Sequence, residues 1–453
     1  MLSIYVTLFF IAFLFKTVAV VESIPIHQSG EKQRYIVVLK NAPITDSPTL
    51  SAESLQPPSM DSVYKTHISW ISEVHSSSSV SSAADPNVTL DVIEREYAIG
   101  DNFRAYAGLF DPKFAELELP KRSEVDHVSL DSEVSVKNVA YENFDIEKYL
   151  EKDNKEDEEV NALKFGKRTQ HNPTWASHYQ RKLPLDGKYA SPVSGGRRVN
   201  IFVVDTGINI NHTDFQGRAS WGTTTIKGSS NIDEYGHGTH VAGIIAGRKY
   251  GVAKASRVIA VKALGKTGSG SWSDVIAGLS WVGEQHKIGT RKSSIVNLSL
   301  TGKYFPPANA AVKALTEIGV HVIVAAGNYF GANSCFFSPA SAPEAITVGA
   351  TNINDTIAKF SNVGPCVDLF APGQNVTSTW LDNNVKMMSG TSMASPHVAG
   401  VIALMISSRE NKSPAQMKTT IRDMSTLGML KFDENPSLKA HNSLLYLGSP
   451  SYL

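Results

Sequence analysis

From about residue 198 onward, the sequence alternates short apolar runs rich in β-branched residues with longer amphipathic or apolar segments. The short runs have the length and composition of buried strands, and the longer segments have those of helices. Strands and helices in strict turn predict a doubly wound α/β fold, with a mostly parallel sheet and helices on both faces. The expected strands are RVNIFVVD, SRVIAVKAL, SSIVNLSL, VHVIVAAG and AITVGA, and the expected helices are HVAGIIAG, WSDVIAGLSWVGEQ, NAAVKALTEIG and SPHVAGVIALMIS.

The overall composition suits a globular protein of more than one domain. The chain has 453 residues, of which 42% are apolar and 19% charged, and its formal net charge is +0. This length predicts two folded units, or one large unit with an appendage. The balanced charge gives no electrostatic reason to bind nucleic acid or an anionic membrane, so we expect neither partner.

The chain begins with an apolar segment, MLSIYVTLFFIAFLFKTVAV, which a polar stretch follows. We interpret residues 1–22 as a secretory signal peptide. A retained signal anchor is the alternative, because no Lys or Arg precedes the apolar run. No later segment reaches the roughly 20 uninterrupted apolar residues of a spanning helix. We therefore expect a protein of the secretory route, without a stable membrane span once the signal is removed.

Cys335 and Cys366 are the two cysteines of the chain. Secretion would place them in an oxidising compartment, so a disulfide is expected, and two buried thiols are the alternative. The sequence also contains acceptor motifs for N-glycosylation. Asn297 matches this motif, but it lies in the apolar stretch SSIVNLSL, where a buried strand would hide it. The other motifs begin at Asn87, Asn211, Asn354, Asn375 and Asn411.

The part of the chain before the alternating region forms a smaller unit. Residues 33–138 contain the β-rich run YIVVLK, a short expected helix HISWISEVH, and two stretches with strand-like alternation, EYAIGDNFRAYAGLF and DHVSLDSEVSVKNV. This pattern predicts a small α+β domain. Residues 139–169 are dense in charge and contain the pair Lys167-Arg168, which indicates a linker, with a solvated helix as the alternative. Residues 170–450 then form the larger domain.

Two polar residues that could carry chemistry occur at expected element ends in the larger domain. Asp205 closes the strand RVNIFVVD, where a carboxylate could orient a histidine. His237, in GHGTH, stands at the start of an expected helix. Its glycine neighbours would let a substrate backbone approach a base at this point. Taken alone, Asp205 would be interpreted as a turn or cap residue.

A pair of histidines in GHGTH could also indicate a metal site. Zincin metalloproteases use His-Glu-x-x-His, with the histidines at i and i+4 and the glutamate as base. Here His237 and His240 stand at i and i+3 without a glutamate between them, and nothing near Asp233 and Glu234 supplies a well-spaced third ligand. We therefore interpret His237 as a base and His240 as a supporting residue within the helix.

A serine and an amide complete the set. Ser392 lies among small residues in MSGTSMASPHVAG, before an apolar helix whose N-terminus would favour developing negative charge. Asn328 follows a strand and a glycine in VIVAAGNYFG, and its amide could donate to an oxyanion. Singly, Ser392 would be a helix N-cap and Asn328 a turn residue. Together with Asp205 and His237, they provide the components of an acyl-transfer site.

The motifs VVDTGIN, GHGTHVAG, AAGN and SGTSMASPHVAG, in this order, resemble the catalytic blocks of the subtilisin-like serine proteases, over about residues 170 to 450. The order Asp205, His237, Ser392 is also the order of the triad in subtilisin. SPASAPEAITVGAT and the two cysteines around FSNVGPCVDLFAPG are similar to the proteinase K subfamily and, within it, to fungal vacuolar proteases of the cerevisin type. The N-terminal unit is similar to the inhibitor prodomain of these enzymes.

This resemblance implies a serine endopeptidase that is made as a precursor and needs no cofactor for catalysis. Ser392 would attack the scissile carbonyl, His237 would take and return the proton, and Asp205 would hold the imidazole. The amide of Asn328 and the backbone N–H of Ser392 would bind the oxyanion. The implied partners are polypeptide substrates and the chain's own prodomain, which acts as an intramolecular inhibitor, and we expect a monomer.

The resemblance also implies a cleft in which the substrate lies extended as an added strand. Small residues at the primary pocket would give an apolar or broad preference and would disfavour a cationic one. One side of the track is formed by Gly268, Ser269 and Gly270, and the other side by Ser299, Leu300 and Thr301. The pocket is lined by Ala325, Ala326 and Gly327.

A structural calcium is a further implication of the resemblance. In the proteinase K group a carboxylate and two carbonyls hold this ion, and the matching positions here are Asp368 and the backbones of Pro343 and Ala345. Hard oxygen ligands of this kind suit calcium.

One residue of the cleft departs from the family pattern. Where relatives usually have Ser-Leu-Gly-Gly, this chain has Thr301 at the first glycine, and the β-branched side chain would narrow or reshape the cleft. A rival hypothesis is that the chain is a weakly active or non-catalytic relative with a structural or binding role in a cell wall. Thr301 and a prodomain that stays bound to the enzyme would be compatible with this hypothesis. An esterase or another hydrolase with the same triad is a third hypothesis, which leaves the extended peptide track unexplained.

The processing site and the final compartment stay open at this point. Self-cleavage is the family expectation for the cut between prodomain and enzyme. Cleavage after Lys167-Arg168 by a kexin-type protease is the rival. The secretory route leads to the extracellular space, the cell wall, or a vacuole-like or lysosome-like compartment.

Overall fold

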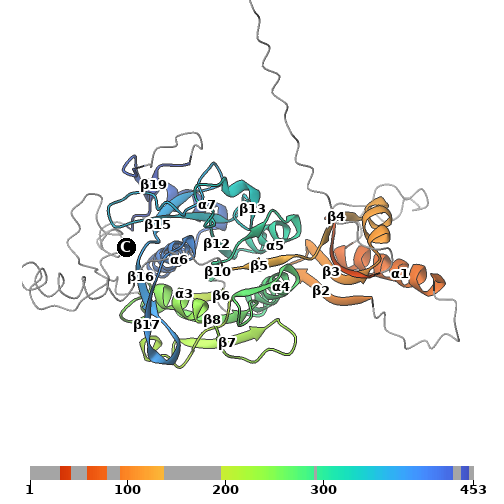
Figure 1. The fold of residues 1–453 in the computed structure, drawn as a ribbon, viewed down its shortest axis with the longest axis horizontal. Helices are drawn as coiled ribbons and strands as arrows, with labels where there is room; N and C mark the ends of the chain where they lie inside the picture. Colours follow the sequence, from red (N-terminus) through yellow and green to blue (C-terminus); the bar gives the residue numbers. More distant parts are fainter. Residues whose placement is uncertain are drawn as a thin grey trace, which may run out of the picture.

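The computed structural model describes residues 31–41, 59–78, 92–136, 195–289, 293–431 and 440–447. The expected signal peptide (1–22), the charged linker (139–169) and the acceptor residue Asn87 lie outside these residues. Figure 1 shows two units, a small one in red and orange and a large one from green to blue. A short strand of the small unit, β5 (Glu133–Ser135), extends into the large one.

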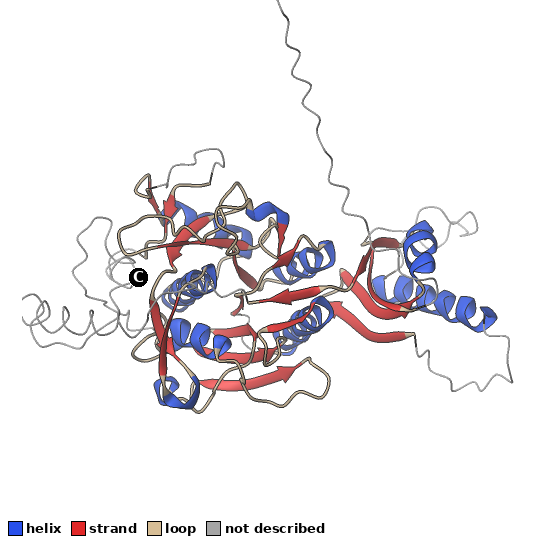
Figure 2. Ribbon diagram, in the orientation of Figure 1, coloured by secondary structure: helices blue, strands red, loops and turns tan. Residues whose placement is uncertain are grey.

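The small unit is a four-stranded antiparallel sheet in the order β2-β3-β1-β4. A long helix packs against one face of this sheet (Figure 2). The unit therefore has the α+β class expected from the sequence. Its elements before β5 are β1 (Gln33–Leu39), α1 (Met60–Ser78), β2 (Ile93–Ile99), β3 (Phe103–Phe110), the short helices Phe114–Glu118 and Leu119–Lys121, and β4 (Val125–Leu130).

The strand β1 shows why YIVVLK is an unbroken apolar run. Side chains alternate between the two faces of a strand. Tyr35, Val37 and Leu39 belong to a buried cluster with residues of α1. Ile36 and Val38 belong to a different cluster, which contains helical residues of the large unit. Both faces of β1 are covered, so the small unit is docked on the large one through an apolar interface.

The large unit contains the predicted parallel sheet. Its nine strands follow the order β18-β19-β15-β14-β12-β10-β6-β8-β7, and every neighbouring pair is parallel except the edge pair β18-β19. The strands are β6 (Asn200–Asp205), β7 (Ala219–Thr224), β8 (Arg257–Lys262), β10 (Ser294–Leu298), β12 (His321–Ala325), β14 (Ile346–Thr351), β15 (Leu369–Pro372), β18 (Thr426–Leu427) and β19 (Ser443–Leu444).

Helices cover both faces of this sheet. Ile201 and Val203 of β6 face a core cluster with α3 and α6, whereas Phe202 and Val204 face a cluster with α4 and α5. The doubly wound prediction is therefore confirmed. The helices are α3 (His237–Ala246), α4 (Trp272–Ile288), α5 (Pro306–Glu317), α6 (Thr391–Ser408) and α7 (Pro414–Met424). The smaller elements are β9 (Ser269–Ser271), β11 (Gly302–Lys303), β13 (Phe337–Ser338), β16 (Val376–Thr379), β17 (Val385–Met388) and the short helices Thr213–Phe215, Ser334–Phe336 and Leu381–Asn383.

The observed elements differ from the expected ones mainly at their ends. The five expected strands are the five adjacent strands β14, β12, β10, β6 and β8. Three helices begin earlier than their apolar patterns indicate, α3 at His237, α5 at Pro306 and α6 at Thr391. Mainly small, polar or proline residues form these first turns, where an apolar pattern gives no signal. The consequence is that His237 and Ser392 lie within helices.

Two expectations about individual residues are confirmed. Cys335 and Cys366 form a disulfide with their Cα atoms 5.4 Å apart. Asn297 lies in β10 and is completely buried, so its glycosylation motif is inaccessible in the folded chain.

The described helices include none with the length and apolar character needed to cross a membrane.

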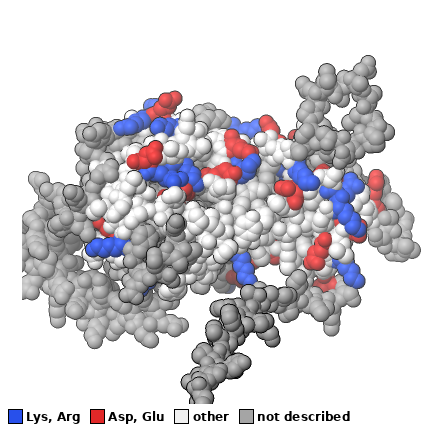
Figure 3. Space-filling model, turned by 90° about the horizontal axis from the view of Figure 1, so that it is seen from above, with Lys and Arg blue, Asp and Glu red and all other residues white. Residues whose placement is uncertain are grey.

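The charged side chains are mixed on the surface. Figure 3 shows one face of the molecule, where Lys and Arg lie next to Asp and Glu and much of the described surface carries no charge. A surface patch of one sign, which nucleic acid would require, is not visible on the described residues of this face.

Candidate active site

Asp205 and His237 lie together at the carboxyl end of the sheet. Asp205 is the last residue of β6 and His237 is the first residue of α3. Nδ1 of His237 lies 2.8 Å from Oδ1 and 2.9 Å from Oδ2 of Asp205, and both side chains are completely buried. A buried carboxylate in this position fixes the orientation of the imidazole ring.

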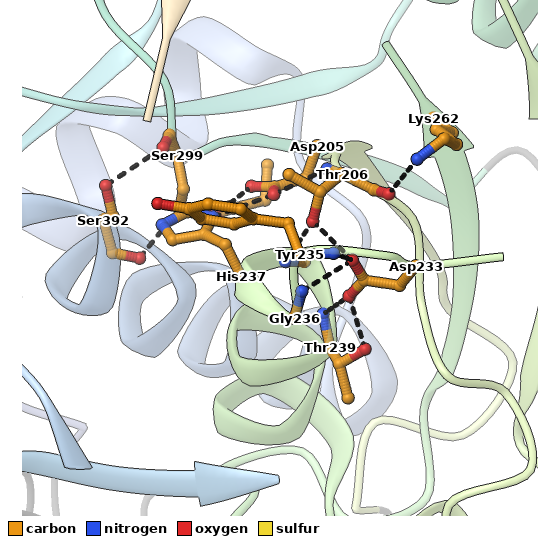
Figure 4. Close-up of polar contacts among 12 residues, drawn as sticks. Asp205, Thr206, Asp233, Tyr235, Gly236, His237, Thr239, Lys262, Ser299 and Ser392 are labelled. Atoms are coloured by element: carbon orange, nitrogen blue, oxygen red, sulfur yellow. Dashed lines mark hydrogen bonds and ion pairs between the residues drawn. The ribbon is translucent and has the colours of Figure 1, made fainter. Parts of the chain in front are cut away.

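Ser392 is on the other side of the same ring. It is the second residue of α6, and its Oγ donates a hydrogen bond of 3.0 Å to the carbonyl of Ser299. Figure 4 shows the ring of His237 between Asp205 and Ser392. Nε2 of His237 is buried and has no hydrogen-bond partner within the described part of the chain. This nitrogen is the atom that a base would use toward the serine hydroxyl.

Ser299, expected in the substrate track, also positions the start of α6. Its hydroxyl donates to the carbonyl of Ser392 at 2.8 Å and contacts Oγ of Ser395 at 2.9 Å. Nδ2 of Asn297 donates to the same hydroxyl at 2.9 Å. The end of β10 is therefore tied to the first turn of α6 by a buried polar network.

Asn328 is held with its amide oxygen turned toward the start of α6. The oxygen accepts hydrogen bonds of 2.9 Å from both the backbone N–H and the hydroxyl of Thr391. The amide nitrogen lies on the side of Gly390, 3.1 Å from the place where a Cβ on that glycine would be. Gly390 lies two residues before Ser392, so the amide nitrogen of Asn328 is close to the start of α6. A hydrogen-bond donor in this place suits an oxyanion site.

Asp233 organises the turn that leads into α3. Its Oδ1 accepts from Oγ1 of Thr206 at 2.8 Å, from the N–H of Tyr235 at 3.1 Å and from the N–H of Gly236 at 2.8 Å. Its Oδ2 accepts from the N–H and the hydroxyl of Thr239 at 3.0 and 2.6 Å. These contacts appear in Figure 4. This role of Asp233 was not predicted from the sequence, although an aspartate just before a helix is a typical capping signal.

Lys262 is a second residue that the sequence analysis missed. Its side chain is completely buried, and Nζ donates to the carbonyl of Thr206 at 2.9 Å and lies 3.5 Å from a carboxylate oxygen of Glu234. Thr206 also accepts at Oγ1 from the N–H of Gly238 at 3.0 Å. Thr206 is thus held through both its backbone and its side chain, directly beside Asp205.

His240 has the supporting role expected for it. Its Nε2 donates to the carbonyls of Val376 and Lys386 at 3.1 and 2.9 Å, which ties α3 to the hairpin of β16 and β17. Burial lowers the pKa of His240 to about 3, so the ring is neutral at ordinary pH. Because Nε2 carries the donated proton, this nitrogen is not available to bind a metal ion.

The comparisons with known proteins agree with this geometry. Residues 196–440 match the Subtilase family, and residues 34–137 match Peptidase inhibitor I9. The chain belongs to the subtilase family. It is therefore a serine endopeptidase with an inhibitor prodomain, a zymogen arrangement.

Relatives of this subtilase occur in fungi. The subtilase-type proteinase isp6 of Schizosaccharomyces pombe, named for the process of sexual differentiation, is 38% identical over 82% of this chain and 75% of its own length. The subtilisin-like serine protease Cla h 9.0101 of Davidiella tassiana is 38% identical over 80% of this chain and 71% of its own. A solved cold-adapted subtilisin-like serine proteinase is 38% identical, with a TM-score of 0.57, and it aligns over 61% of this chain and 98% of its own.

In this subtilase the end of the prodomain lies along the expected substrate track. β5 pairs antiparallel with β9, so that Ser135 is opposite Ser269. On its other side Ser135 forms an antiparallel bridge with Thr301, with N···O distances of 3.1 and 3.4 Å. The N–H of Val136 donates to the carbonyl of Gly268 at 3.0 Å. The segment is therefore an added strand between the two sides that the sequence analysis named, Gly268 to Gly270 and Ser299 to Thr301.

The residues expected at the primary pocket lie at the carboxyl end of β12 and directly after it. Ala325, Ala326 and Gly327 are buried. Gly327 has a φ of +104°, and a Cβ on it would lie 2.4 Å from Nδ2 of Asn362 and 3.3 Å from Cγ2 of Thr301. Only glycine fits this position. The methyl group of Thr301 therefore packs directly beside the pocket backbone.

A side chain of the prodomain also binds the first turn of α4. The carboxylate of Asp131 accepts from the N–H and the hydroxyl of Ser273 at 3.1 and 2.7 Å. Nearby, Nη1 of Arg95 donates to Oδ1 of Asp274 at 2.7 Å. Burial raises the pKa of Asp131, and the hydrogen bonds from Ser273 oppose this effect. An aspartate from the prodomain thus caps a helix of the enzyme.

The groups expected to hold calcium lie together, but they surround an ammonium group. Nζ of Lys418 donates to the carbonyls of Pro343 and Ala345 at 2.8 and 2.6 Å, and it lies 2.9 Å from Oδ2 of Asp368. The donor set with Lys418 in place does not fit a calcium ion, because the positive group already occupies the centre of the three oxygens. We derive no role for calcium in this arrangement.

Proposed function

We propose that this subtilase hydrolyses peptide bonds of polypeptide substrates through an acyl-enzyme, with Asp205, His237 and Ser392 as its triad. The observation that supports the proposal most directly is the contact of His237 Nδ1 with both oxygens of Asp205. The position of Ser392 on the other side of the ring (Figure 4) also supports the proposal.

In the proposed mechanism Ser392 Oγ attacks the scissile carbonyl while Nε2 of His237 takes its proton. Asp205 stabilises the imidazolium that forms, since it is buried against Nδ1. The amide nitrogen of Asn328, the backbone N–H of Ser392 and the N-terminus of α6 stabilise the oxyanion. His237 then protonates the leaving amine, and a water molecule hydrolyses the acyl-enzyme by the same steps.

The proposed primary preference is apolar or broad. Ala325, Ala326 and Gly327 offer no charged group to a substrate side chain. Main-chain hydrogen bonds along Gly268 to Gly270 and along Thr301 would supply affinity that depends little on sequence.

We further propose that the chain matures in the secretory pathway by cutting itself behind its prodomain. The disulfide between Cys335 and Cys366 suits an oxidising compartment. Because Val136 already lies beside Gly268 in the cleft, self-cleavage is expected within a few residues after Val136. A mature chain that instead begins directly after Arg168, in both the active precursor and its Ser392→Ala variant, would favour the kexin-type alternative.

The decisive experiment is covalent labelling of the mature chain with a phosphonate or sulfonyl fluoride probe. The labelled peptide is identified by mass spectrometry in the wild type and in the variants His237→Ala and Ser392→Ala. We expect the wild type to be labelled at Ser392 and both variants to remain unlabelled, because the serine needs the histidine as its base.

A neighbouring histidine provides a matched control. His240→Gln, one turn along α3, keeps an N–H donor for the hairpin carbonyls and is expected to retain labelling at Ser392. A folded wild-type chain, free of its prodomain, that fails to react would contradict the proposal and would favour a binding or structural role.

A further inference from the structure

Lys418 lies at a junction between three segments of the large unit. It belongs to α7, which contacts the loop before β14 through Pro343 and Ala345. It also contacts the residue that precedes β15, Asp368. The carboxylate of Asp368 is buried and accepts a hydrogen bond of 2.9 Å from the N–H of Thr347 in β14. One side chain therefore connects a helix to the starts of two neighbouring strands.

The ammonium group of Lys418 has all its hydrogens engaged. It has three N–H donors, and its three oxygen partners lie at 2.6, 2.8 and 2.9 Å. Its side chain is only 20% exposed. Arg422, one turn further along α7, brings a second positive group, with Nη1 3.8 Å from Oδ1 of Asp368. The carboxylate thus faces two cations from the same helix.

The other face of α7 is fixed independently of these cations. Met417 and Ile421 are buried in the main core cluster. Ser413 and Gln416 form a capping box at the helix start. The helix is therefore expected to remain folded and docked when Lys418 is shortened, with a local loss of order around Asp368.

The oxygens around Lys418 are of the type that binds a hard cation. A calcium ion takes about six to eight oxygen ligands, typically carboxylates, backbone carbonyls and waters. A carboxylate and two carbonyls are present, but a divalent ion among them would be a few ångströms from a fixed ammonium group. The two cations therefore exclude each other from this position.

We propose that Lys418 is a covalently tethered cation that replaces a structural calcium ion at this junction, and that shortening its side chain uncovers a calcium site. A bound ion stabilises the fold only in proportion to its free concentration relative to its dissociation constant. A tethered ammonium has no such dependence. The stability that this junction contributes to the large unit is therefore independent of calcium, and chelators leave that contribution unchanged.

The test compares the full-length chain with Lys418→Ser, both in a Ser392→Ala background that prevents self-digestion. Thermal unfolding and hydrogen exchange of peptides covering α7 and Thr347 are measured in excess EDTA, in millimolar calcium chloride, and in sodium chloride of matched ionic strength. Lys313→Ser is the matched control, because Lys313 forms an ion pair with Glu317 on the surface of α5.

The wild type is expected to give the same exchange in α7 and at Thr347 in all three solutions. Lys418→Ser is expected to unfold at a lower temperature in EDTA, with faster exchange in α7 and at Thr347. Calcium, but not sodium chloride, is expected to reverse both changes. Lys313→Ser is expected to respond to neither calcium nor EDTA.

Two results would overturn the proposal. The first is a wild type whose exchange in α7 and at Thr347 becomes faster in EDTA and slower again with calcium. The second is a folded Lys418→Ser chain whose stability and local exchange do not respond to calcium. If Lys418→Ser cannot be obtained folded even with calcium present, that failure also counts against an uncovered calcium site.

Discussion

Oγ1 of Thr206 donates a hydrogen bond of 2.8 Å to Oδ1 of Asp233. Thr206 follows Asp205 in the chain, and Asp233 accepts hydrogen bonds from the backbone that leads into His237. This buried contact therefore fixes the relative positions of the strand end and the helix start that carry two members of the proposed triad.

Replacing Asp233 by Asn is expected to lower both stability and turnover. The new NH2 group would face N–H and O–H donors, which leaves buried donors unsatisfied at a cost of about 2–4 kcal/mol in the free energy of unfolding. Because the substrate track is not touched, kcat is expected to fall while KM changes little. Kinetics and chemical unfolding measure the two effects. Asp382→Asn, at an exposed position, is the control, and equal behaviour of the two variants would contradict the expectation.

Replacing Thr301 by Gly is expected to widen the primary pocket. The methyl group of Thr301 packs beside Gly327, so its removal makes room for larger substrate side chains. We expect kcat/KM for peptides with an aromatic residue before the scissile bond to rise about tenfold relative to alanine peptides. Alanine peptides serve as the internal control. An unchanged ratio would place the methyl group outside the pocket that substrates use.

Replacing Asp131 by Ala is expected to weaken inhibition by the prodomain. The change leaves the N–H and hydroxyl of Ser273 without their carboxylate partner, and hydrogen bonds to a charged group are typically worth about 1.5–3 kcal/mol. We expect the inhibition constant of prodomain supplied in trans to rise about tenfold to a hundredfold. Arg95→Ala removes a more exposed ion pair with Asp274 and is expected to have a smaller effect. The reverse ranking would contradict the capping role of Asp131.

The large unit is expected to lose stability as the solution becomes acidic. Burial lowers the pKa of His240 to about 3 and that of His397 to about 4, whereas an unfolded histidine titrates near 6.5. As the pH falls, the unfolded chain takes up protons first. The stability due to the neutral rings is therefore complete above about pH 6.5 and is lost progressively toward pH 4 and 3.

Unfolding of the phosphonate-labelled mature enzyme between pH 4 and pH 8 measures this effect. Each such histidine contributes a slope of up to about 1.4 kcal/mol per pH unit below pH 6.5. His240→Gln is expected to reduce the slope by about this amount, while His441→Gln, at an exposed position, is expected to leave it unchanged. Equal slopes in the wild type and His240→Gln would mean that His240 is already protonated in the folded state.

The sheet could be predicted from the sequence, and Asp205, His237, Asn328 and Ser392 could be proposed as site residues from it, because their signals are local. The β-branched runs that became β6, β8, β10, β12 and β14 are continuous in the chain. Asp205, His237, Asn328 and Ser392 each lie within a short glycine-containing motif at an element end. Topology then brings the carboxyl ends of parallel strands to one edge.

The residues that the sequence did not predict act through distant partners. Lys262 is 56 positions from its acceptor Thr206, and Lys418 is 75 positions from Pro343. The sequence does not show whether a lysine is buried or exposed. Only the fold shows which carbonyl groups surround its ammonium group. Asp233 is an exception, because its capping contacts are local. An aspartate shortly before α3 is a helix-capping signal that the sequence already contains.

The last strand of the prodomain is recognised through its backbone and through the buried side chains of Val134 and Val136. Ser135 and Val136 are held by N–H and carbonyl groups, which most residue types provide equally well. Mutations of Ser135 can therefore accumulate without ending inhibition, provided that Val134 and Val136 remain apolar and small enough for their buried places. Asp131 contacts Ser273 through its carboxylate, so few other residues can replace it. We therefore expect substitutions to be tolerated less at this helix cap than at Ser135, which lies in the cleft.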